Sequence, residues 1–221
     1  MTSPDHAESQ SSALEARTAH HFGSFETQRH AMRFGMWLFL ATEVLLFGGL
    51  FVAYSVYRSV FHEAFQAASR HLDLTLGTVN TVVLITSSFT VAIAIHFMHH
   101  DKKWPAAISL LSTIAMACAF LVIKSFEYAH KFEEGALPGQ YYHFHEVQIP
   151  GAAMFFTLYF IMTGLHAIHV IIGILVLGFL MIQTVRNRYA GGYDLPLELG
   201  GLYWHLVDLV WIFLFPLLYL I

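Results

Sequence analysis

The sequence predicts an all-α protein, a polytopic membrane helix bundle with five transmembrane helices. Hydrophobic residues make up 57% of the chain and charged residues 12%, and the mean hydropathy is +0.58, which lies outside the usage of soluble domains. Five apolar runs are each long enough to cross a bilayer, which takes about 20 helical residues. The net charge of −4 comes without a basic stripe, which argues against nucleic-acid binding.

Residues 1–30 precede the first apolar run and are expected to form a mobile cytoplasmic tail. They are polar and carry Asp5, Glu8 and Glu15, a composition that matches neither a secretory signal nor a transit peptide. Residues 31–221 are expected to form the five-helix transmembrane domain.

The boundaries of the spans follow from the polar residues between them. The first span is expected at residues 34–57, between Arg33 and Arg58, with Glu43 as its only charge. The polar link that follows, residues 58–73, has room for one extra amphipathic turn. The other spans are expected at residues 74–98, 106–128, 151–184 and 199–221. The fourth is long enough that it must tilt or project beyond the bilayer.

The distribution of Lys and Arg predicts the orientation in the membrane. Five spans place the two termini on opposite sides, and cytoplasmic loops carry an excess of Lys and Arg. Seven of these residues fall on the N-terminal side, and four on the other: Arg17, Arg29, Arg33, Lys102, Lys103, Arg186 and Arg188 against Arg58, Arg70, Lys124 and Lys131. The N-terminus is therefore expected in the cytoplasm and the C-terminus in the periplasm or outside the cell.

Polar side chains occur near the middle of three spans: Glu43 in the first, His166 and His169 in the fourth, and His205 and Asp208 in the fifth. An unpaired charge at bilayer depth costs about 2.5–3.5 kcal/mol. These groups are therefore expected to form one buried polar cluster, with His205 beside Asp208, where the three helices meet. Three interpretations stay open: hydrogen bonds that fix helix register, a carboxylate and imidazole metal site, and proton transfer by a membrane-depth acid.

Small and polar residues also recur along two spans. Asn80 and Ser87 lie seven residues apart in the second span, and Thr163 and Gly173 share one stripe of the fourth. Because small side chains let membrane helices approach closely, these four positions are expected at helix-packing contacts.

The remaining histidines gather on the predicted cytoplasmic side. His20 and His21 lie in the tail, and His96, His99 and His100 lie at the end of the second span. Imidazole titrates near neutral pH, so exposed histidines are candidates for collecting protons. A solvated position without function is the alternative interpretation.

Each of the first three spans contains a short sequence motif. Residues 35–51 read GMWLFLATEVLLFGGLF, and residues 79–94 read VNTVVLITSSFTVAIA. The third span ends in Glu127 and Tyr128.

The fourth and fifth spans each contain a motif as well. The pattern F-x-x-T-G-x-H-x-x-H-V-x-x-G begins at Phe160, and YWHLVDLVW begins at Tyr203. In this order and spacing, the five segments resemble subunit III of haem-copper respiratory oxidases, the cytochrome c oxidase subunit III family. Leu206 stands where that family usually has Phe.

The resemblance implies a non-catalytic subunit of a bacterial haem-copper terminal oxidase. Many family members have seven spans, and the five found here are similar to the short bacterial form. Such a chain holds no redox centre or metal of its own. It stabilises subunit I, holds phospholipid and supports proton uptake on the cytoplasmic side. Glu43 corresponds to the family's buried glutamate, and Gly164 and Trp204 join the expected packing positions.

The resemblance also implies what the whole complex does. Haem and copper belong to the partner subunit, and the complex reduces O2 to water in aerobic respiratory electron transport, coupled to proton translocation across the bacterial inner membrane. Subunit I is the expected direct partner, with subunit II and a larger respiratory supercomplex beyond it. Cytochrome c and quinol both stay open as electron donor, as does the haem type.

Two other classes of function compete with this interpretation. A stand-alone membrane metalloenzyme would use the cluster of Glu43, His166, His169, His205 and Asp208, and metal analysis of the purified chain separates it from an oxidase subunit. A proton channel or transporter predicts inverted internal repeats, and the sequence shows no such symmetry.

Overall fold

A computed structural model describes residues 22–137, 142, 149–189 and 194–221. The described residues contain six helices: α2 (Phe25–Val60), α3 (His62–Ser69), α4 (Leu74–His99), α5 (Lys103–Glu133), α6 (Ala152–Val185) and α7 (Leu195–Tyr219). All except α3 are long and apolar enough to cross a membrane. The predicted fold class, an all-α polytopic bundle with five spans, is confirmed.

The helix bounds differ from the expected spans mainly at the ends. Helix α2 begins at Phe25, where the Ser24 hydroxyl caps it by accepting a hydrogen bond from the Thr27 amide at 3.2 Å. The last residues of the expected tail are therefore helical, whereas residues 1–21 lie outside the described part. The short helix α3 fills the polar link between the first two spans, as expected.

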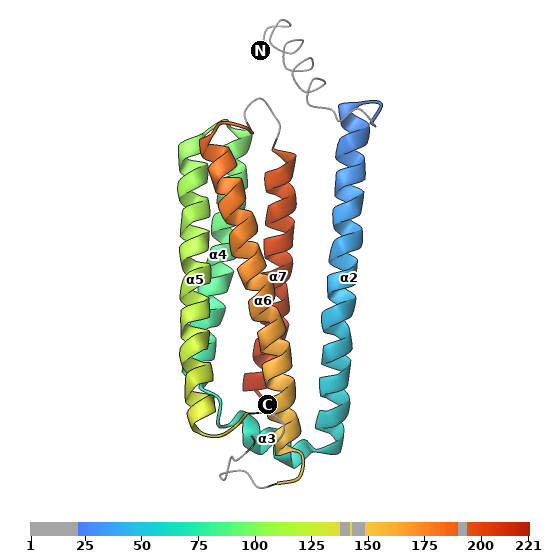
Figure 1. Ribbon diagram of the computed structural model, residues 1–221, viewed down its shortest axis with the longest axis vertical. Coiled ribbons are helices and arrows are strands. Elements are labelled where there is room, and N and C mark those ends of the chain that lie inside the picture. The colour runs from blue at the N-terminus through green and yellow to red at the C-terminus, as the bar shows by residue number, and fades with distance from the viewer. Residues whose placement is uncertain (1–21, 138–141, 143–148, 190–193) are drawn as a thin grey trace, which may run out of the picture.

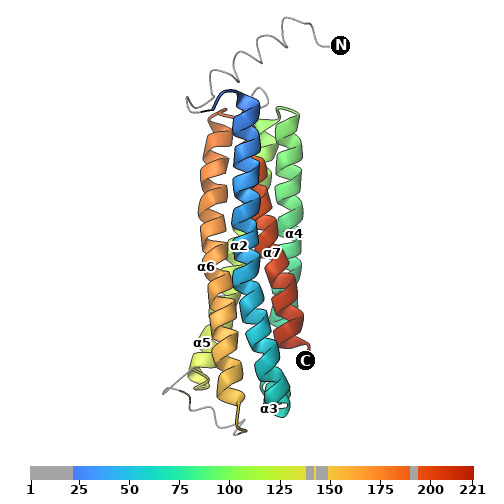
Figure 2. The same cartoon turned by 90° about the vertical axis from the view of Figure 1, so that its right-hand side faces the viewer.

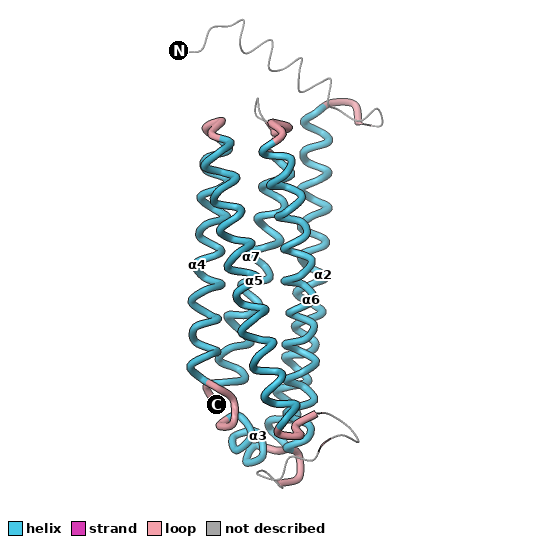
Figure 3. Tube along the Cα trace, turned by 60° about the vertical axis from the view of Figure 1, so that its left-hand side comes forward, coloured by secondary structure: helices cyan, strands magenta, loops and turns pink. Residues whose placement is uncertain are grey.

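Helices α4 to α7 pack into a four-helix bundle, and α2 stands along one side of it (Figure 1). One end of the molecule, the upper end, carries the start of α2, the α4–α5 turn and the start of α7. The lower end carries α3 and the C-terminus (Figures 1 and 2). The turn from α4 to α5 is tight, with Asp101 at a φ of 55°. Helix α4 therefore ends at the upper end, and α5 runs back down from there, antiparallel to α4 (Figure 3).

Helix α2 contacts the bundle through a narrow stripe. Apart from Gln28 near its start, its buried residues are Leu40, Phe47 and Tyr54, which recur every seven residues and so lie on one face of the helix. The stripe ends at Tyr54, whose hydroxyl donates a hydrogen bond to the Leu217 carbonyl of α7 at 2.6 Å. Many other large apolar side chains of α2 are exposed, which leaves them free for lipid or another protein.

Glycine is required where α6 begins. Gly151 has a φ of 101°, and a Cβ atom at this position would lie 2.5 Å from Cγ of Phe61, the residue that joins α2 to α3. A larger residue would be strained in backbone and would also clash. This contact fixes the start of α6 against the α2–α3 corner.

Candidate functional site

Glu43 and His169 join helix α2 to helix α6. Their side chains are 14% and 12% exposed, and His169 Nε2 lies 2.8 Å from Glu43 Oε2. The other ring nitrogen, Nδ1, lies 2.8 Å from the Leu165 carbonyl oxygen, which only accepts hydrogen bonds, so Nδ1 carries a proton. The contact between Nε2 and Oε2 then needs a second proton, on either the imidazole or the carboxyl. Glu43 and His169 therefore share one proton between Nε2 and Oε2.

His205 and Asp208 lie on α7 and face α4. His205 Nδ1 and the Ser88 hydroxyl are 2.6 Å apart, so the partner of His205 is Ser88, not Asp208 as the sequence had suggested. Ser88 also faces the Asp208 carboxyl, but without the geometry of a hydrogen bond. Asp208 is 3% exposed, and among the residues that the structure describes neither of its carboxyl oxygens has a hydrogen-bond partner.

His166 occupies a third environment, in the interior of the four-helix bundle. Its ring meets Phe120 edge to face, at a centroid distance of 5.6 Å, and lies 5.2 Å from the Trp211 ring. Both ring nitrogens are buried, and neither has a hydrogen-bond partner in the described part of the chain. The five polar residues picked out in the sequence therefore do not share one hydrogen-bonded cluster; they divide among three places in the bundle.

Trp204 organises the packing positions expected on α4 and α6. Its indole Nε1 donates a hydrogen bond to the Ser87 hydroxyl at 3.0 Å, and a Cβ atom added at Gly173 would lie 2.6 Å from Trp204 Cζ3. One tryptophan of α7 thus fills the space that a small residue leaves on α6, and its polar edge is satisfied by α4.

The other packing positions have different roles. The Thr163 hydroxyl lies 2.5 Å from the Tyr128 hydroxyl, which ties α6 to α5. A Cβ atom added at Gly164 would lie 3.9 Å from the hydroxyl oxygen of the same tyrosine, an ordinary van der Waals distance. Asn80 is fully buried, and neither its amide nitrogen nor its oxygen has a hydrogen-bond partner among the described residues.

A buried ionic network on α5, α6 and α7 was not anticipated as a site. Lys124 donates hydrogen bonds to Glu127 Oε2 at 3.1 Å, to the Tyr159 hydroxyl oxygen at 2.9 Å and to the Tyr219 hydroxyl oxygen at 2.8 Å. Both tyrosine hydroxyls donate to Glu127 Oε1, at 2.7 and 2.5 Å. We call these four residues the Lys124 network. The spacing of Lys124 and Glu127 was visible in the sequence, but their tyrosine partners come from distant helices.

The upper end holds a chain of ionisable groups that joins three helices. His99 Nδ1, at the end of α4, lies 2.5 Å from Asp194 Oδ2, and His99 Nε2 lies 3.7 Å from Glu198 Oε1. Arg33 of α2 lies 2.7 Å from the second carboxyl oxygen of Glu198. The rings of His96, on α4, and His100, its C-cap residue, lie with their centroids 4.5 Å apart and their planes tilted by 46°. His20 and His21 lie outside the described residues.

A cavity of about 440 Å³ extends from this chain toward the interior. Arg33 and Glu198 line it at one end, and it reaches His205, the partner of Ser88, with Trp37 and Ile95 among its walls. The cavity therefore connects the exposed charged groups of the upper end with the polar contact between α7 and α4.

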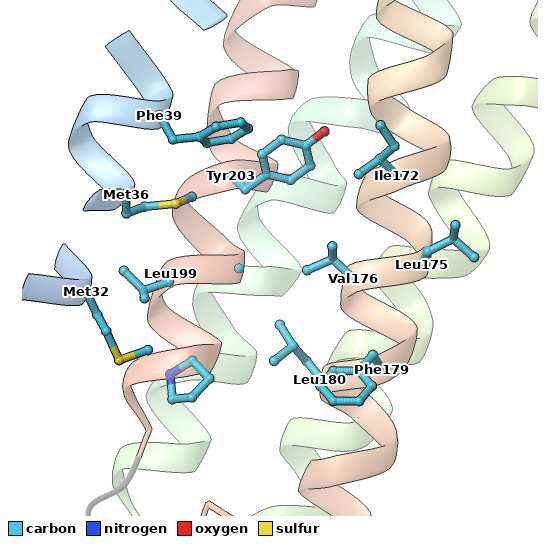
Figure 4. Close-up of a pocket in the computed structure, with 12 residues that line it drawn as sticks. Met32, Met36, Phe39, Ile172, Leu175, Val176, Phe179, Leu180, Leu199 and Tyr203 are labelled. Atoms are coloured by element: carbon cyan, nitrogen blue, oxygen red, sulfur yellow. The ribbon is translucent and has the colours of Figure 1, made fainter. Parts of the chain in front are cut away.

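An apolar groove lies between α2 and the pair α6 and α7. Its volume is about 580 Å³, and Figure 4 shows side chains of all three helices around it. Its lining is almost wholly hydrocarbon: Met32, Met36, Phe39, Ile172, Leu175, Val176, Phe179, Leu180, Pro196, Leu199, Gly200 and Tyr203. A groove of this chemistry suits an acyl chain rather than a polar solute.

The buried polar residues do not converge on a metal site. Three or more His, Cys, Asp or Glu side chains can share an ion where their donor atoms lie close enough together. Within the ranges that the structure describes, one group meets this condition: His99, Asp194 and Glu198, at the upper end. Glu43, His166, His169, His205 and Asp208 do not form such a group. The ligand set that the metalloenzyme interpretation requires is therefore not assembled among the described residues.

Comparisons with known proteins connect these features to a family. The sequence profile described as "Cytochrome c oxidase subunit III" matches residues 14–221. The chain is 32% identical over 190 residues to the probable quinol oxidase subunit 3 of Staphylococcus haemolyticus, covering 86% of this chain and 88% of that protein. It is 30% identical over 192 residues to the protein of the same name in Staphylococcus aureus strain USA300, with the same coverage.

A third relative is a longer polypeptide. The chain is 32% identical over 200 residues to the heme-copper oxidase subunit I+III of Aeropyrum pernix, covering 86% of this chain. It spans only 23% of the length of that protein.

Proposed function

The chain belongs to the cytochrome c oxidase subunit III family, and we propose that it is the non-catalytic subunit III of a bacterial haem-copper terminal oxidase. Family membership makes it a multi-pass membrane subunit of an oxidoreductase complex with other oxidase subunits as partners. In the proposal, haem and copper reside in subunit I, and this chain stabilises that subunit, holds phospholipid and supports proton uptake. The electron donor is a quinol or cytochrome c.

Contact with subunit I is proposed for the open side of helix α2. Large apolar side chains of α2 are uncovered, among them Phe34 at 65%, Leu45 at 75% and Val52 at 65% exposure. Apolar residues in a bilayer face either lipid or another helix. The Aeropyrum relative carries the designations I and III in one polypeptide, which supports direct contact between the two parts in this protein as well.

Lipid binding is proposed for the apolar groove. The groove lies where α2 stands away from α6 and α7. Among the side chains that line it, the Tyr203 hydroxyl is the one polar group. That hydroxyl is already bonded to the His169 carbonyl, at 3.1 Å. A phospholipid acyl chain in this groove would fill the space between α2 and the bundle and so support the position of α2.

Support of proton uptake is proposed for the upper end, which we place in the cytoplasm. Most of the Lys and Arg residues lie on this side, so the C-terminus at the lower end would face the periplasm or the exterior. His96, His99 and His100, with His20 and His21 of the tail, would collect protons. The cavity from Glu198 to His205 gives these groups a path inward, and the Glu43–His169 pair holds a proton deeper in the membrane.

The match of the family profile to residues 14–221 is the observation that carries the proposal. The test is to tag the chain, purify it in mild detergent and record the visible spectrum of the preparation. Subunits I and II with haem absorption are expected to co-purify. If the chain purifies alone, and alone consumes O2 or holds a stoichiometric metal, the metalloenzyme replaces the oxidase subunit.

The role of the Glu43–His169 pair is tested in the assembled oxidase. Glu43→Ala is expected to leave assembly largely intact but to speed the loss of activity over many turnovers, because the pair can no longer hold its proton. Glu43→Gln is the matched control for packing, since it keeps the size and an oxygen acceptor. The measurements are the yield of intact complex and O2 consumption over prolonged turnover. If both variants lose assembly, the role of Glu43 is structural.

A further inference from the structure

The His99, Asp194 and Glu198 cluster has the donor set and the supporting contacts of a cation site. We propose that His99 Nε2 and Glu198 Oε1 bind a divalent transition-metal ion, of which Zn²⁺ is the best match, with Asp194 orienting the imidazole. Water would complete the coordination. This proposal goes beyond the role of the chain as an oxidase subunit, and only its test, which uses the assembled complex, rests on that proposed function.

The distance between the two proposed ligand atoms fits a metal ion. His99 Nε2 and Glu198 Oε1 are 3.7 Å apart, which is too long for a hydrogen bond. Two ligand atoms of a tetrahedral Zn²⁺ are roughly 3.3 Å apart, given bonds of about 2.0–2.1 Å to nitrogen and oxygen. Glu198 needs to move by only a few tenths of an ångström to reach that spacing. A mixed imidazole and carboxylate set suits Zn²⁺ better than Ca²⁺ or Mg²⁺.

Both ligands already have the outer contacts that metal ligands usually have. His99 Nδ1 lies 2.5 Å from Asp194 Oδ2, so the ring nitrogen that faces Glu198 is Nε2. A carboxylate behind a histidine in this way fixes the tautomer and orientation of a zinc ligand. Arg33 donates to Glu198 Oε2 at 2.7 Å, which turns the other oxygen, Oε1, toward His99.

The cluster is accessible and its members are anchored at helix ends. The His99 side chain is 45% exposed, so an ion can reach it from water. His99 is the last residue of α4. Asp194 is the N-cap residue of α7, and its backbone carbonyl accepts hydrogen bonds from the Leu197 and Glu198 amides at 2.9 and 3.1 Å. A bound ion would therefore fasten α4 to α7, and through Arg33 it would hold the upper end of α2.

Charge and protonation give the proposal a pH dependence. The charged groups that face His99 are Asp194 and Glu198 of α7, and Arg33 of α2 acts through Glu198. With a neutral imidazole these groups sum to one negative charge, which favours a cation. Protons compete with the metal for Nε2, so binding is expected to weaken as the pH falls.

The test counts zinc in the purified oxidase. The complex is treated with chelator, dialysed against Zn²⁺ and analysed by mass spectrometry for bound metal, as wild type and as the variants His99→Gln and His100→Gln. His100 is the matched control, because it lies next to His99 in the sequence but its Nδ1 bonds to the His96 carbonyl at 2.9 Å. Wild type and His100→Gln are expected to hold one zinc ion more than His99→Gln. Asp194→Asn, which keeps both ligands, is expected to weaken binding by about 10–100-fold.

X-ray absorption at the zinc edge provides a readout that a purely structural role would not change. Imidazole nitrogen and carboxylate oxygen are expected in the wild-type spectrum, and the difference between wild type and His99→Gln reports this site alone. Equal zinc content and affinity in wild type, His99→Gln and Asp194→Asn would overturn the proposal. So would loss of the ion in His100→Gln with retention in His99→Gln, which would assign the zinc to the His96 and His100 pair.

Discussion

Two groups of buried polar residues in the same four-helix bundle differ in how they are satisfied. In the Lys124 network, a lysine, a glutamate and two tyrosines make five mutual hydrogen bonds between 2.5 and 3.1 Å. By contrast, Asn80, His166 and Asp208 are equally buried, and their side-chain polar atoms have no hydrogen-bond partner among the described residues.

The difference shows that burial alone does not tell what a polar residue contributes to a membrane helix bundle. A network whose every member is paired fixes the relative positions of α5, α6 and α7, because breaking one contact leaves the others unsatisfied. A buried polar group without a hydrogen-bond partner costs free energy instead, so its polar atoms do not fix the helices relative to one another.

Removing the positive charge of Lys124 from the Lys124 network is expected to have the largest effect on stability. Lys124→Met leaves Glu127 as a buried charge without its cation, and a broken buried pair typically costs about 3–5 kcal/mol. The variant is expected to unfold at a markedly lower temperature in the detergent-solubilised complex, or to fail to assemble. Lys102→Met, at an exposed position of the upper turn, is the control and is expected to change the melting temperature little.

A double variant separates the ionic bond from its geometry. Lys124→Met combined with Glu127→Gln removes both charges, so part of the loss seen in Lys124→Met is expected to return. Equal melting temperatures for the single and double variants would mean that lost packing, not an uncompensated charge, explains the effect. In that case the contrast between paired and unpaired groups would lose its basis.

Packing beside Trp204 is expected to give an intermediate effect. In Gly173→Ala the new methyl group overlaps the indole, which lies 2.6 Å away, and overpacking of this kind costs about 1–3 kcal/mol. Gly178→Ala on the same helix is the matched control, because nothing lies within 4 Å of its added Cβ. It is expected to leave stability unchanged or raise it slightly, since Ala forms helix better than Gly by about 1 kcal/mol. Equal shifts in melting temperature for Gly173→Ala and Gly178→Ala would rule out the close contact between Gly173 and Trp204.

A substitution of Asp208, whose carboxyl is unpaired, is expected to have the smallest effect on stability. Asp208→Asn keeps the shape but removes a carboxyl that has no partner, so the melting temperature is expected to stay the same or rise, by a free energy of about 1 kcal/mol at most. O2 consumption and proton uptake by the assembled oxidase are measured on the same variant. A loss of stability as large as that of Lys124→Met would show that Asp208 is paired in the assembled complex.

Much of the fold was predictable from periodicity and hydropathy. Runs of about 20 apolar residues can cross a bilayer only as helices, because the backbone must satisfy its own hydrogen bonds there. The spans were therefore located well in their middles, and the short helix α3 was anticipated. Their ends were less certain, since α2 begins well before the apolar run and α5 continues beyond Tyr128 to Glu133.

The candidate site was predictable only in part. Glu43 and His169 were named and do meet, and Trp204, Ser87 and Gly173 do lie at one packing contact. His205 was expected beside Asp208 but is hydrogen-bonded to Ser88, because helical spacing tells which residues share a face but not which neighbouring helix that face meets. The tyrosines of the Lys124 network were missed for the same reason, since Tyr159 and Tyr219 reach it from two other helices.

The sequence by itself determined that this is a five-span helical membrane protein of the subunit III family, because hydropathy acts locally and the family's motifs are short and contiguous. Only the tertiary structure decided which polar groups are paired. Hydrogen bonds and ion pairs depend on distances of a few tenths of an ångström between helices. Those distances are set by packing side chains from all of the helices at once.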